Sequence, residues 1–354
     1  MTSAVESRHP VLVTGIGGGG HGEQILKALK LVDRYFIVGA DAIGECANRH
    51  EVAHFSLLPH AHDPRYLAEL VALAERFSCR AIFHGSEAEM MVLSQERERL
   101  SERGFYVPVN PPSVMRICQD KSATMAFLAA QGARVPAFRK VRSLADCSDF
   151  RDFPAVIKPS RGGGGSANVF IVQNSEELHL FSTYLLGMYE GFVLQEYVGT
   201  PDQEYTVGVL FSADGELLNS IAIRRVINNA LTIRTSVPNR TGRCELGSRL
   251  VISTGISQGY VGDWPELLRQ CEHIASALKP RAPINIQCRL VDGLVVPFEI
   301  NPRFSGTTSL RALAGYNEPD ALFRRDVLGE RIATHFPYQK GLILRSLKEN
   351  LISS

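Results

Sequence analysis

Short apolar runs alternate with helical patterns between residue 10 and about residue 110, and this order restricts the fold more than any other feature of the chain. The apolar runs are Val11–Thr14, Phe36–Ala40 and Arg80–His84, and the helical patterns are Gly22–Leu31, Pro64–Phe77 and Ala88–Arg103. A strand, a helix and a second strand in this order form a right-handed unit whose strands are parallel. We therefore predict a Rossmann-like α/β domain over residues 1–112, ending at a group of prolines.

The chain becomes β-rich after Pro154, so a second region of the α+β class is expected. The predicted strands are Ala155–Lys158, Ala167–Val172, Phe192–Tyr197, Tyr205–Phe211, Leu217–Arg225, Ile284–Leu290 and Leu294–Ile300. Helices are predicted at Val114–Cys118, Lys121–Gln131, Ser175–Leu186, Trp264–Leu278 and from about Pro319. We expect a central part over residues 113–200 with a glycine-rich lid at about 150–196, and a C-terminal part over residues 201–354 with a metal site. Residues 236–262 are expected to form a loop over that site.

The last predicted strand, Leu294–Ile300, leads into a polar segment that suits a metal ion. Side chains two positions apart on a strand share a face, so Glu299 and Asn301 point to the same side. A carboxylate and an amide oxygen are hard ligands suited to Mg²⁺ carrying a nucleotide phosphate, and Arg303 suits a phosphoryl oxygen. Taken alone, the segment fits an ordinary strand end with a solvated acid equally well.

A first glycine cluster, Gly15–Gly20, follows the first strand and opens a helix. It satisfies the pattern GxGxxG, and Asp41 ends the second strand, where a dinucleotide-binding fold places its ribose-binding acid. This pairing is the strongest argument for an NAD(P)-dependent oxidoreductase. Any phosphate or carboxylate can bind a helix N-terminus in this way, and a tight strand–helix turn without a ligand explains the glycines as well.

A second glycine cluster, Arg161–Ser166, joins two predicted strands of the β-rich region. The preceding strand carries Lys158, and a glycine hairpin after a lysine can place an ammonium and backbone N–H groups over a triphosphate. No helix follows the glycines, so the segment is not a Walker loop. The alternative is a flexible surface hairpin with a solvated lysine.

Composition excludes several classes of function. The 354 residues carry a net charge of +1 with no basic block, so we expect neither nucleic acid nor a membrane surface as a partner. No apolar run approaches the roughly 20 residues that span a bilayer, and the first ten residues lack the apolar core of a signal peptide. The seven cysteines are scattered without a CxxC pair, which favours a reducing, cytoplasmic location and argues against a zinc site.

Together these segments resemble the ATP-grasp superfamily of ligases over about residues 11–329. The likeness depends on their order: an α/β domain, Lys121 at a helix start, Lys158 before a glycine loop, and Glu-x-Asn-Pro-Arg at the end. Carbamoyl-phosphate synthetase halves and the ATP-grasp ligase of pyrrolysine synthesis are the most similar members. The stretches VLVTGIGGGGHG, HGSEAE and NPRFSGTTSLRALAGYNEP carry that similarity. The resemblance implies a pre-ATP-grasp domain over residues 1–112, followed by a two-part ATP-grasp domain.

The resemblance also implies roles for individual residues. Residues matching the ATP contacts are Lys121, Lys158, Gly163, Gly164, Ser166, Glu196, Tyr197, Val198 and Glu204. Gln287, Glu299 and Asn301 match the ligands of one or two Mg²⁺ ions, with Mn²⁺ as an alternative ion. Gln287 shares a face with Glu299 if the two strands pair across the turn Asp292-Gly293. Lys158 and Arg303 would be catalytic. Lys158 would contact the phosphates of ATP, and Arg303 would steady the γ-phosphoryl group.

Substrate contacts are the least determined part of the site. The candidates are His21, Ser86, Glu87, Arg225, Arg234, Ser305 and Gly306. An arginine pair such as Arg225 and Arg234 suits an α-carboxylate, so an amino acid is expected. Surface or structural roles remain the ordinary alternative for each of these residues.

The reaction that follows from the resemblance is ATP-dependent carboxylate–amine ligation through an acyl phosphate, with small-molecule substrates and a homodimeric assembly. The chain has one ATP-grasp unit, no glutaminase-like segment, and lysines where carbamoyl-phosphate synthetase has arginines. These departures favour a stand-alone ligase. The open alternatives are a bicarbonate- or carbamate-phosphorylating enzyme of the same superfamily, an NAD(P)-dependent oxidoreductase, and a non-catalytic nucleotide sensor.

Overall fold

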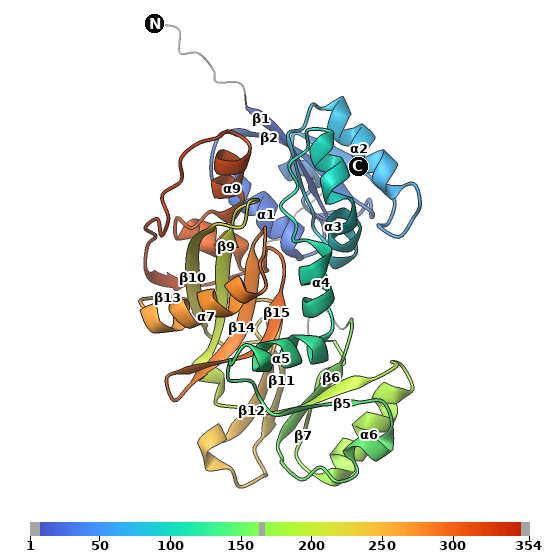
Figure 1. Cartoon of the computed structure of the whole chain (residues 1–354), viewed down its shortest axis with the longest axis vertical. Coiled ribbons are helices and arrows are strands. Elements are labelled where there is room, and N and C mark those ends of the chain that lie inside the picture. Colours follow the sequence, from blue (N-terminus) through green and yellow to red (C-terminus); the bar gives the residue numbers. More distant parts are fainter. Residues whose placement is uncertain (1–7, 163–166, 348–354) are drawn as a thin grey trace, which may run out of the picture.

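The computed structural model describes residues 8–162 and 167–347, and the described chain forms three larger sheets and a two-stranded hairpin. The N-terminal sheet with its helices lies at one end of the molecule. A second four-stranded sheet, formed by the middle part of the chain, lies at the other end (Figure 1). The largest sheet lies between them. Among the described residues, no helix combines the length and apolar character needed to cross a bilayer.

The N-terminal sheet has four parallel strands in the order β3-β2-β1-β4. Its strands are β1 (His9–Thr14), β2 (Tyr35–Asp41), β3 (His54–Leu57) and β4 (Ala81–Phe83), and its helices are α1 (His21–Leu29), α2 (Tyr66–Arg76) and α3 (Glu87–Glu102). The predicted Rossmann-like α/β architecture is confirmed. The edge strand β3 was not predicted, because its four residues, three half-buried and one exposed, give little apolar signal.

Two glycines of this region are required by close packing. A Cβ at Gly85 would lie 2.0 Å from the carbonyl oxygen of Thr14, and one at Gly22 would lie 2.2 Å from the same atom. No side chain fits at such distances, because backbone atoms cannot move aside. The glycines therefore let α1 and the loop after β4 pack against the end of β1.

The sheet formed by the middle part of the chain, which we call the central sheet, is antiparallel with the strand order β5-β8-β6-β7. It contains β5 (Phe138–Val141), β6 (Ala155–Pro159), β7 (Phe170–Val172) and β8 (Phe192–Glu196), with α6 (Ser175–Leu186) packed against it. Two short helices, α4 (Pro112–Cys118) and α5 (Lys121–Ala130), connect it to the N-terminal sheet. Three of its strands come from the segment predicted as the glycine-rich lid, whereas β5 was not predicted.

The largest sheet, which we call the C-terminal sheet, has six antiparallel strands in the order β15-β14-β9-β10-β13-β16. These strands are β9 (Glu204–Phe211), β10 (Leu217–Arg225), β13 (Gly259–Val261), β14 (Ile284–Val291), β15 (Leu294–Asn301) and β16 (Gly341–Ile343). The helices α7 (Pro265–Ala277), α8 (Thr308–Leu313) and α9 (Glu318–Asp326) accompany them.

The expectation that residues 236–262 form a loop is wrong. The hairpin of β11 (Ile233–Pro238) and β12 (Arg249–Ser253) occupies much of this segment, and β13 follows it. The hairpin is held in place by apolar contacts, since Leu250 and Ile252 pack with Tyr197 at the end of β8. The segment therefore forms a wall beside the central sheet.

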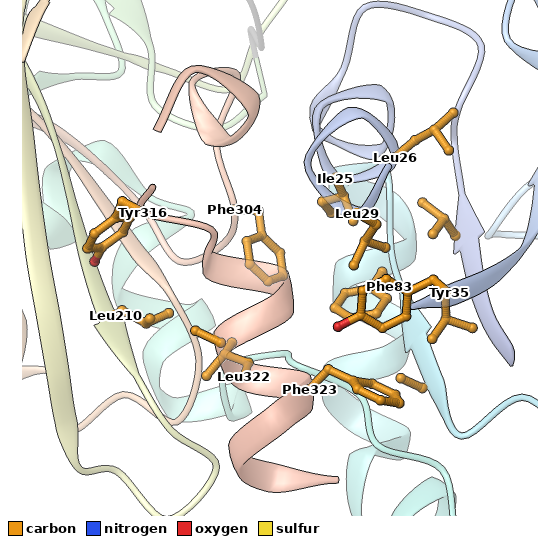
Figure 2. Packing of buried hydrophobic residues seen from close by; sticks show 14 of the residues in the cluster. Ile25, Leu26, Leu29, Tyr35, Phe83, Leu210, Phe304, Tyr316, Leu322 and Phe323 are labelled. Carbon is orange, nitrogen blue, oxygen red and sulfur yellow. The ribbon is translucent and has the colours of Figure 1, made fainter. Parts of the chain in front are cut away.

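One hydrophobic core joins the N-terminal sheet to the C-terminal region. Figure 2 shows Tyr35 and Phe83 of the N-terminal sheet facing Phe304 and Phe323 from the C-terminal region. Burying an aromatic side chain of this kind contributes about 1.5–3 kcal/mol. The Tyr35 hydroxyl also donates to Asp320 Oδ1 at 2.7 Å. These contacts fix the N-terminal unit against the sheet that carries the candidate site.

Candidate active site

A cavity of about 730 Å³ opens between the central sheet and the C-terminal sheet. Part of its wall is apolar, and this part consists of Val156, Val169, Tyr197, Val198, Val251, Ile252 and Phe298. Six of the residues predicted to contact ATP line it, namely Lys121, Lys158, Glu196, Tyr197, Val198 and Glu204. The other three, Gly163, Gly164 and Ser166, lie outside the described residues. An apolar slot with cationic groups at one end suits a nucleotide.

Both lysines of this cavity are placed by regular structure. Asp120 caps α5 by accepting hydrogen bonds from two backbone N–H groups, which puts Lys121 in the first turn of the helix. Lys158 lies on β6, and its Nζ donates to the Phe298 carbonyl oxygen at 2.8 Å. Burial lowers the pKa of Lys158 to about 8, although the Glu299 carboxylate opposes this effect. Lys158 is therefore a buried ammonium in the cavity wall that forms no ion pair with any residue of the described ranges.

Glu204 is held in a buried ion-pair network. Its Oε1 accepts hydrogen bonds from Arg225 Nη1 at 2.8 Å and from Ser253 Oγ at 2.6 Å, and its Oε2 accepts one from Arg289 Nη2 at 3.2 Å. Burial opposes the ionisation of Glu204, but the two guanidiniums outweigh it and hold its pKa below the ordinary value. The network fixes β9, β10 and β14 around the base of the cavity.

Neither predicted substrate arginine is among the residues that line this cavity. Besides bonding Glu204, Arg225 donates to the carbonyl oxygens of Thr254 and Ile256 at 2.8 and 3.0 Å, and it is buried. Arg234 lies exposed on β11. The structure therefore uses Arg225 to position the segment after β12, and their predicted contact with a substrate carboxylate remains a prediction.

Gln287, Glu299 and Asn301 lie together, as the strand pattern predicted. Gln287 and Glu299 are direct partners in the pairing of β14 with β15, and all three residues line a second cavity of about 540 Å³. No described residue forms a hydrogen bond with the Gln287 carboxamide, so its oxygen is available. No group of three or more His, Cys, Asp or Glu residues that could hold a metal occurs in the described ranges. The donor set is one carboxylate and two amide oxygens, which fits Mg²⁺.

Arg303 lies at the edge of this second cavity, bonded to groups from both ends of the chain. Its Nη2 donates to Glu87 Oε1 at 2.9 Å and to Asn301 Oδ1 at 3.3 Å, and its Nη1 donates to the Phe304 carbonyl oxygen at 3.0 Å. Glu87 stands in the first turn of α3, which Ser86 caps by accepting from Glu89 N. The predicted residues Glu87, Ser305 and Gly306 line the cavity with Arg303, whereas Ser86 is positioned as the helix cap.

His21 is buried against a second histidine. Its Nε2 lies 3.2 Å from His84 Nδ1, and neither ring is exposed appreciably. Burial lowers the pKa of both rings, to about 3 for His84, and the Arg303 guanidinium lowers both further. Both rings are neutral near pH 7, so His21 and His84 form a buried, uncharged pair.

Arg289 and Asn285 are among the site residues that the sequence analysis missed. Arg289 lines the first cavity and Asn285 lines the second, and both lie on β14 with Gln287 between them. The alternation that paired Glu299 with Asn301 would have placed all three β14 residues on one face.

Comparisons with known proteins agree with this geometry. Residues 189–350 match the sequence model of a family described as ATP-grasp in the biosynthetic pathway with Ter operon. A search of curated proteins finds no match. The residues matched by the family model include the C-terminal sheet and the candidate metal site.

Solved structures resemble the chain over most of its length. The L-amino acid ligase of Bacillus licheniformis has a TM-score of 0.63 at 17% identity, covering 91% of this chain and 74% of that protein. An N5-carboxyaminoimidazole synthetase of Staphylococcus aureus, complexed with ADP, has a TM-score of 0.64 at 14% identity, with coverages of 95% and 81%. The biotin carboxylase domain of Hydrogenobacter thermophilus 2-oxoglutarate carboxylase, in complex with MgADP, ADP and bicarbonate, has a TM-score of 0.62 at 15% identity, with coverages of 92% and 71%.

The chain has the ATP-grasp fold, an N-terminal α/β unit followed by two antiparallel sheets with a cavity between them. Residues 189–350 match an ATP-grasp family and the described chain shares the fold of ATP-grasp ligases, so the predicted resemblance is confirmed.

Proposed function

We propose that this protein is an ADP-forming carboxylate–amine ligase that acts through an acyl phosphate. The observation that carries the proposal is that the two cavities share Gln287 and Glu299 in their walls. A nucleotide in the first cavity would direct its terminal phosphate toward these residues. A carboxylate in the second cavity would then meet that phosphate beside Arg303.

The first cavity supports binding of the whole nucleotide. Its apolar walls suit the adenine ring, and the backbone of Glu196–Val198 at the end of β8 offers hydrogen bonds to the edge of the base. Lys121 and Lys158 at the other end would neutralise the phosphates. The bound ion would be held by Gln287, Glu299 and Asn301. Mg²⁺ there, or Mn²⁺ in its place, would offset negative charge on the β- and γ-phosphates during transfer.

The chemistry then needs positioning more than covalent catalysis. An oxygen of the substrate carboxylate attacks the γ-phosphorus, the bond to the β-phosphate oxygen breaks, and ADP leaves. A neutral amine, having lost one proton, attacks the acyl carbon; phosphate leaves and the amide loses the second amine proton to solvent. Arg303 would orient the γ-phosphoryl group and the acyl phosphate through its two terminal nitrogens.

The dinucleotide alternative is disfavoured by the state of Asp41. Its Oδ2 accepts from Gly17 N at 2.8 Å, and its Oδ1 accepts from Ile43 N at 3.1 Å. Both oxygens hold the loop itself, so support of the strand–helix turn accounts for the carboxylate without a dinucleotide. The bicarbonate-phosphorylating alternative belongs to the same superfamily and would use the same cavities. The experiment below distinguishes it from the ligase.

The decisive test is Glu299→Gln, which keeps the shape of the side chain and removes the only carboxylate among the three candidate ligands. ADP formation should fall by at least about 100-fold, because charge compensation during phosphoryl transfer is lost. The matched control, Glu102→Gln, changes an exposed acid at the end of α3 and should be silent. Unchanged turnover in Glu299→Gln would refute the proposal.

The same assay separates the related reactions. ADP release that requires both a carboxylate and an amine, with an amide detected by mass spectrometry, supports the ligase. ADP release that depends on bicarbonate alone would support the phosphorylating enzyme instead. Removing divalent ions with EDTA should abolish either reaction, and light scattering would test the proposed homodimer.

A further inference from the structure

We propose that the second cavity is the subsite for the carboxylate that becomes phosphorylated, and that it takes a small hydrophilic acid. We call it the donor cavity; Asn285, Ser257, Thr307, Gln287, Asn301 and Arg303 are among its lining residues. The inference rests on the proposed ligase function and adds the chemical class of one substrate. It depends on three features of the cavity: its position, its wall chemistry and one oriented amide.

The position of the donor cavity defines what must lie in it. It shares Gln287 and Glu299 with the nucleotide cavity, and Arg303 is among its own lining residues. A carboxylate beside Arg303 gains a charge-assisted hydrogen bond. The acid Glu87 is 50% exposed and already paired with Arg303, so it faces the outer side.

The wall chemistry excludes an apolar side chain on the substrate. Among the described residues that line the donor cavity, none has an aliphatic or aromatic side chain; glycine, hydroxyl, amide and charged groups make up the wall. Five of the lining residues are hydroxyl residues that are nearly fully buried or half-buried, namely Thr206, Thr254, Ser257, Ser305 and Thr307. Burying a methylene group of the substrate contributes about 0.8 kcal/mol of binding free energy only where its neighbours are apolar. In this cavity an apolar side chain would leave the polar groups of the wall without hydrogen-bond partners.

Asn285 supplies an oriented donor. Its Oδ1 accepts hydrogen bonds from Arg311 Nη2 at 2.6 Å and from Thr206 Oγ1 at 2.9 Å. A guanidinium can only donate, so the oxygen must face Arg311 and the Nδ2 amide must face away from it. No described residue accepts a hydrogen bond from that Nδ2, although Asn285 is 2% exposed. The amide therefore offers two N–H groups to an oxygen of the substrate.

Ser257 offers a second polar contact from a different strand connection. It lies between β12 and β13, is 5% exposed, and its hydroxyl has no hydrogen-bond partner among the described residues. Together with Asn285 it lines the donor cavity with groups that recognise hydroxyl, amide or carboxylate oxygens. A leucine-like side chain would desolvate both without replacing their bonds to water.

The experiment compares substrates of matched shape. ADP release and hydroxamate formation are measured with MgATP and hydroxylamine, using the pairs asparagine and leucine, threonine and valine, and glycolate and propionate. Two variants accompany the wild type. Asn285→Asp keeps the oxygen that Arg311 bonds and replaces the donor with an acceptor, and Ser257→Ala removes one hydroxyl. Ser101→Ala, at an exposed site on α3, is the control.

We expect the polar member of at least one pair to exceed its partner in kcat/KM by about 100-fold or more. Asn285→Asp should raise the KM for that acid at least tenfold, while the KM for ATP and the melting temperature change little. Preference for the apolar members, or an unchanged KM in Asn285→Asp, would overturn the inference while leaving the ligase function standing. ATP binding without ADP release from any acid in the panel would overturn both.

Discussion

Lys158 gives the proposed nucleotide site a measurable pH dependence. Its ammonium is 6% exposed, and burial lowers its pKa from an ordinary 10.5 to about 8. At about 1.4 kcal/mol per pKa unit this difference corresponds to a cost of about 3 kcal/mol for keeping the charge buried. A triphosphate beside the ammonium would remove most of that cost and raise the pKa again. ATP should therefore bind best to the protonated form of Lys158.

The direction of the effect follows from proton linkage. In the protein without nucleotide, the unfolded chain binds more protons than the folded chain between about pH 8 and pH 10.5, so stability should rise with pH across this window. Nucleotide affinity runs the other way. Below pH 8 the lysine is already charged, and above it binding must take up a proton. The dissociation constant should thus increase about tenfold between pH 7 and pH 9.

Isothermal titration calorimetry with a non-hydrolysable ATP analogue and Mg²⁺ measures both quantities. Repeating the titration at pH 9 in buffers of different ionisation enthalpy should give an uptake approaching one proton per site. Lys158→Met should weaken binding by about 1.5–3 kcal/mol at pH 7 and abolish the pH dependence. Lys340→Met, at a lysine that is 58% exposed, is the matched control.

The variant also separates a structural from a nucleotide-binding role. Lys158→Met removes the buried charge but leaves the Phe298 carbonyl oxygen without its partner, which costs about 1–3 kcal/mol. These terms nearly offset one another, so the melting temperature without nucleotide should change little. Full affinity in Lys158→Met, or an affinity independent of pH from 7 to 9, would refute the reasoning.

Two further predictions concern the framework of the site. Glu204→Gln should lower the free energy of unfolding by about 3–5 kcal/mol in urea titrations, because it leaves Arg225 and Arg289 buried without their counter-ion; a loss below 1 kcal/mol would contradict the network. Gly85→Ala should cost more than about 2 kcal/mol in thermal unfolding, since its Cβ would lie 2.0 Å from the Thr14 carbonyl oxygen. Gly18→Ala, where nothing lies within 4 Å, should be neutral, and an equal effect at both glycines would contradict the packing argument.

The arrangement of the candidate metal ligands could be predicted because it depends on local rules. The turn Asp292-Gly293 has positive φ values at both residues, 52° and 76°, the conformation of a two-residue hairpin turn. That turn sets the pairing of β14 with β15, and the alternation of side chains does the rest. Gln287 therefore meets Glu299 without any information from distant segments.

The environment of Glu204 could not be predicted in the same way. Its partners Arg225, Ser253 and Arg289 lie 21, 49 and 85 residues away in the chain. Their meeting depends on the strand order β14-β9-β10 and on the hairpin of β11 and β12. A buried arginine within a strand suits a substrate contact and an internal ion pair equally well. The structure shows that both terminal nitrogens of Arg225 bond protein groups, and the sequence alone does not reveal these partners.

The N-terminal unit also acquires a role that its glycine pattern did not suggest. Gly15–Gly20 resembled a dinucleotide loop, yet Asp41 holds that loop through Gly17 N. The contribution of the unit to the site comes instead from α3, where the Ser86 cap fixes Glu87 beside Arg303. Because the aromatic core of Figure 2 ties this unit to the C-terminal sheet, Glu87 is held against the donor cavity from outside. Arg303 thereby bonds a residue 216 positions away, so the N-terminal fold helps to position Arg303 although ATP contacts none of its strands in the proposed arrangement.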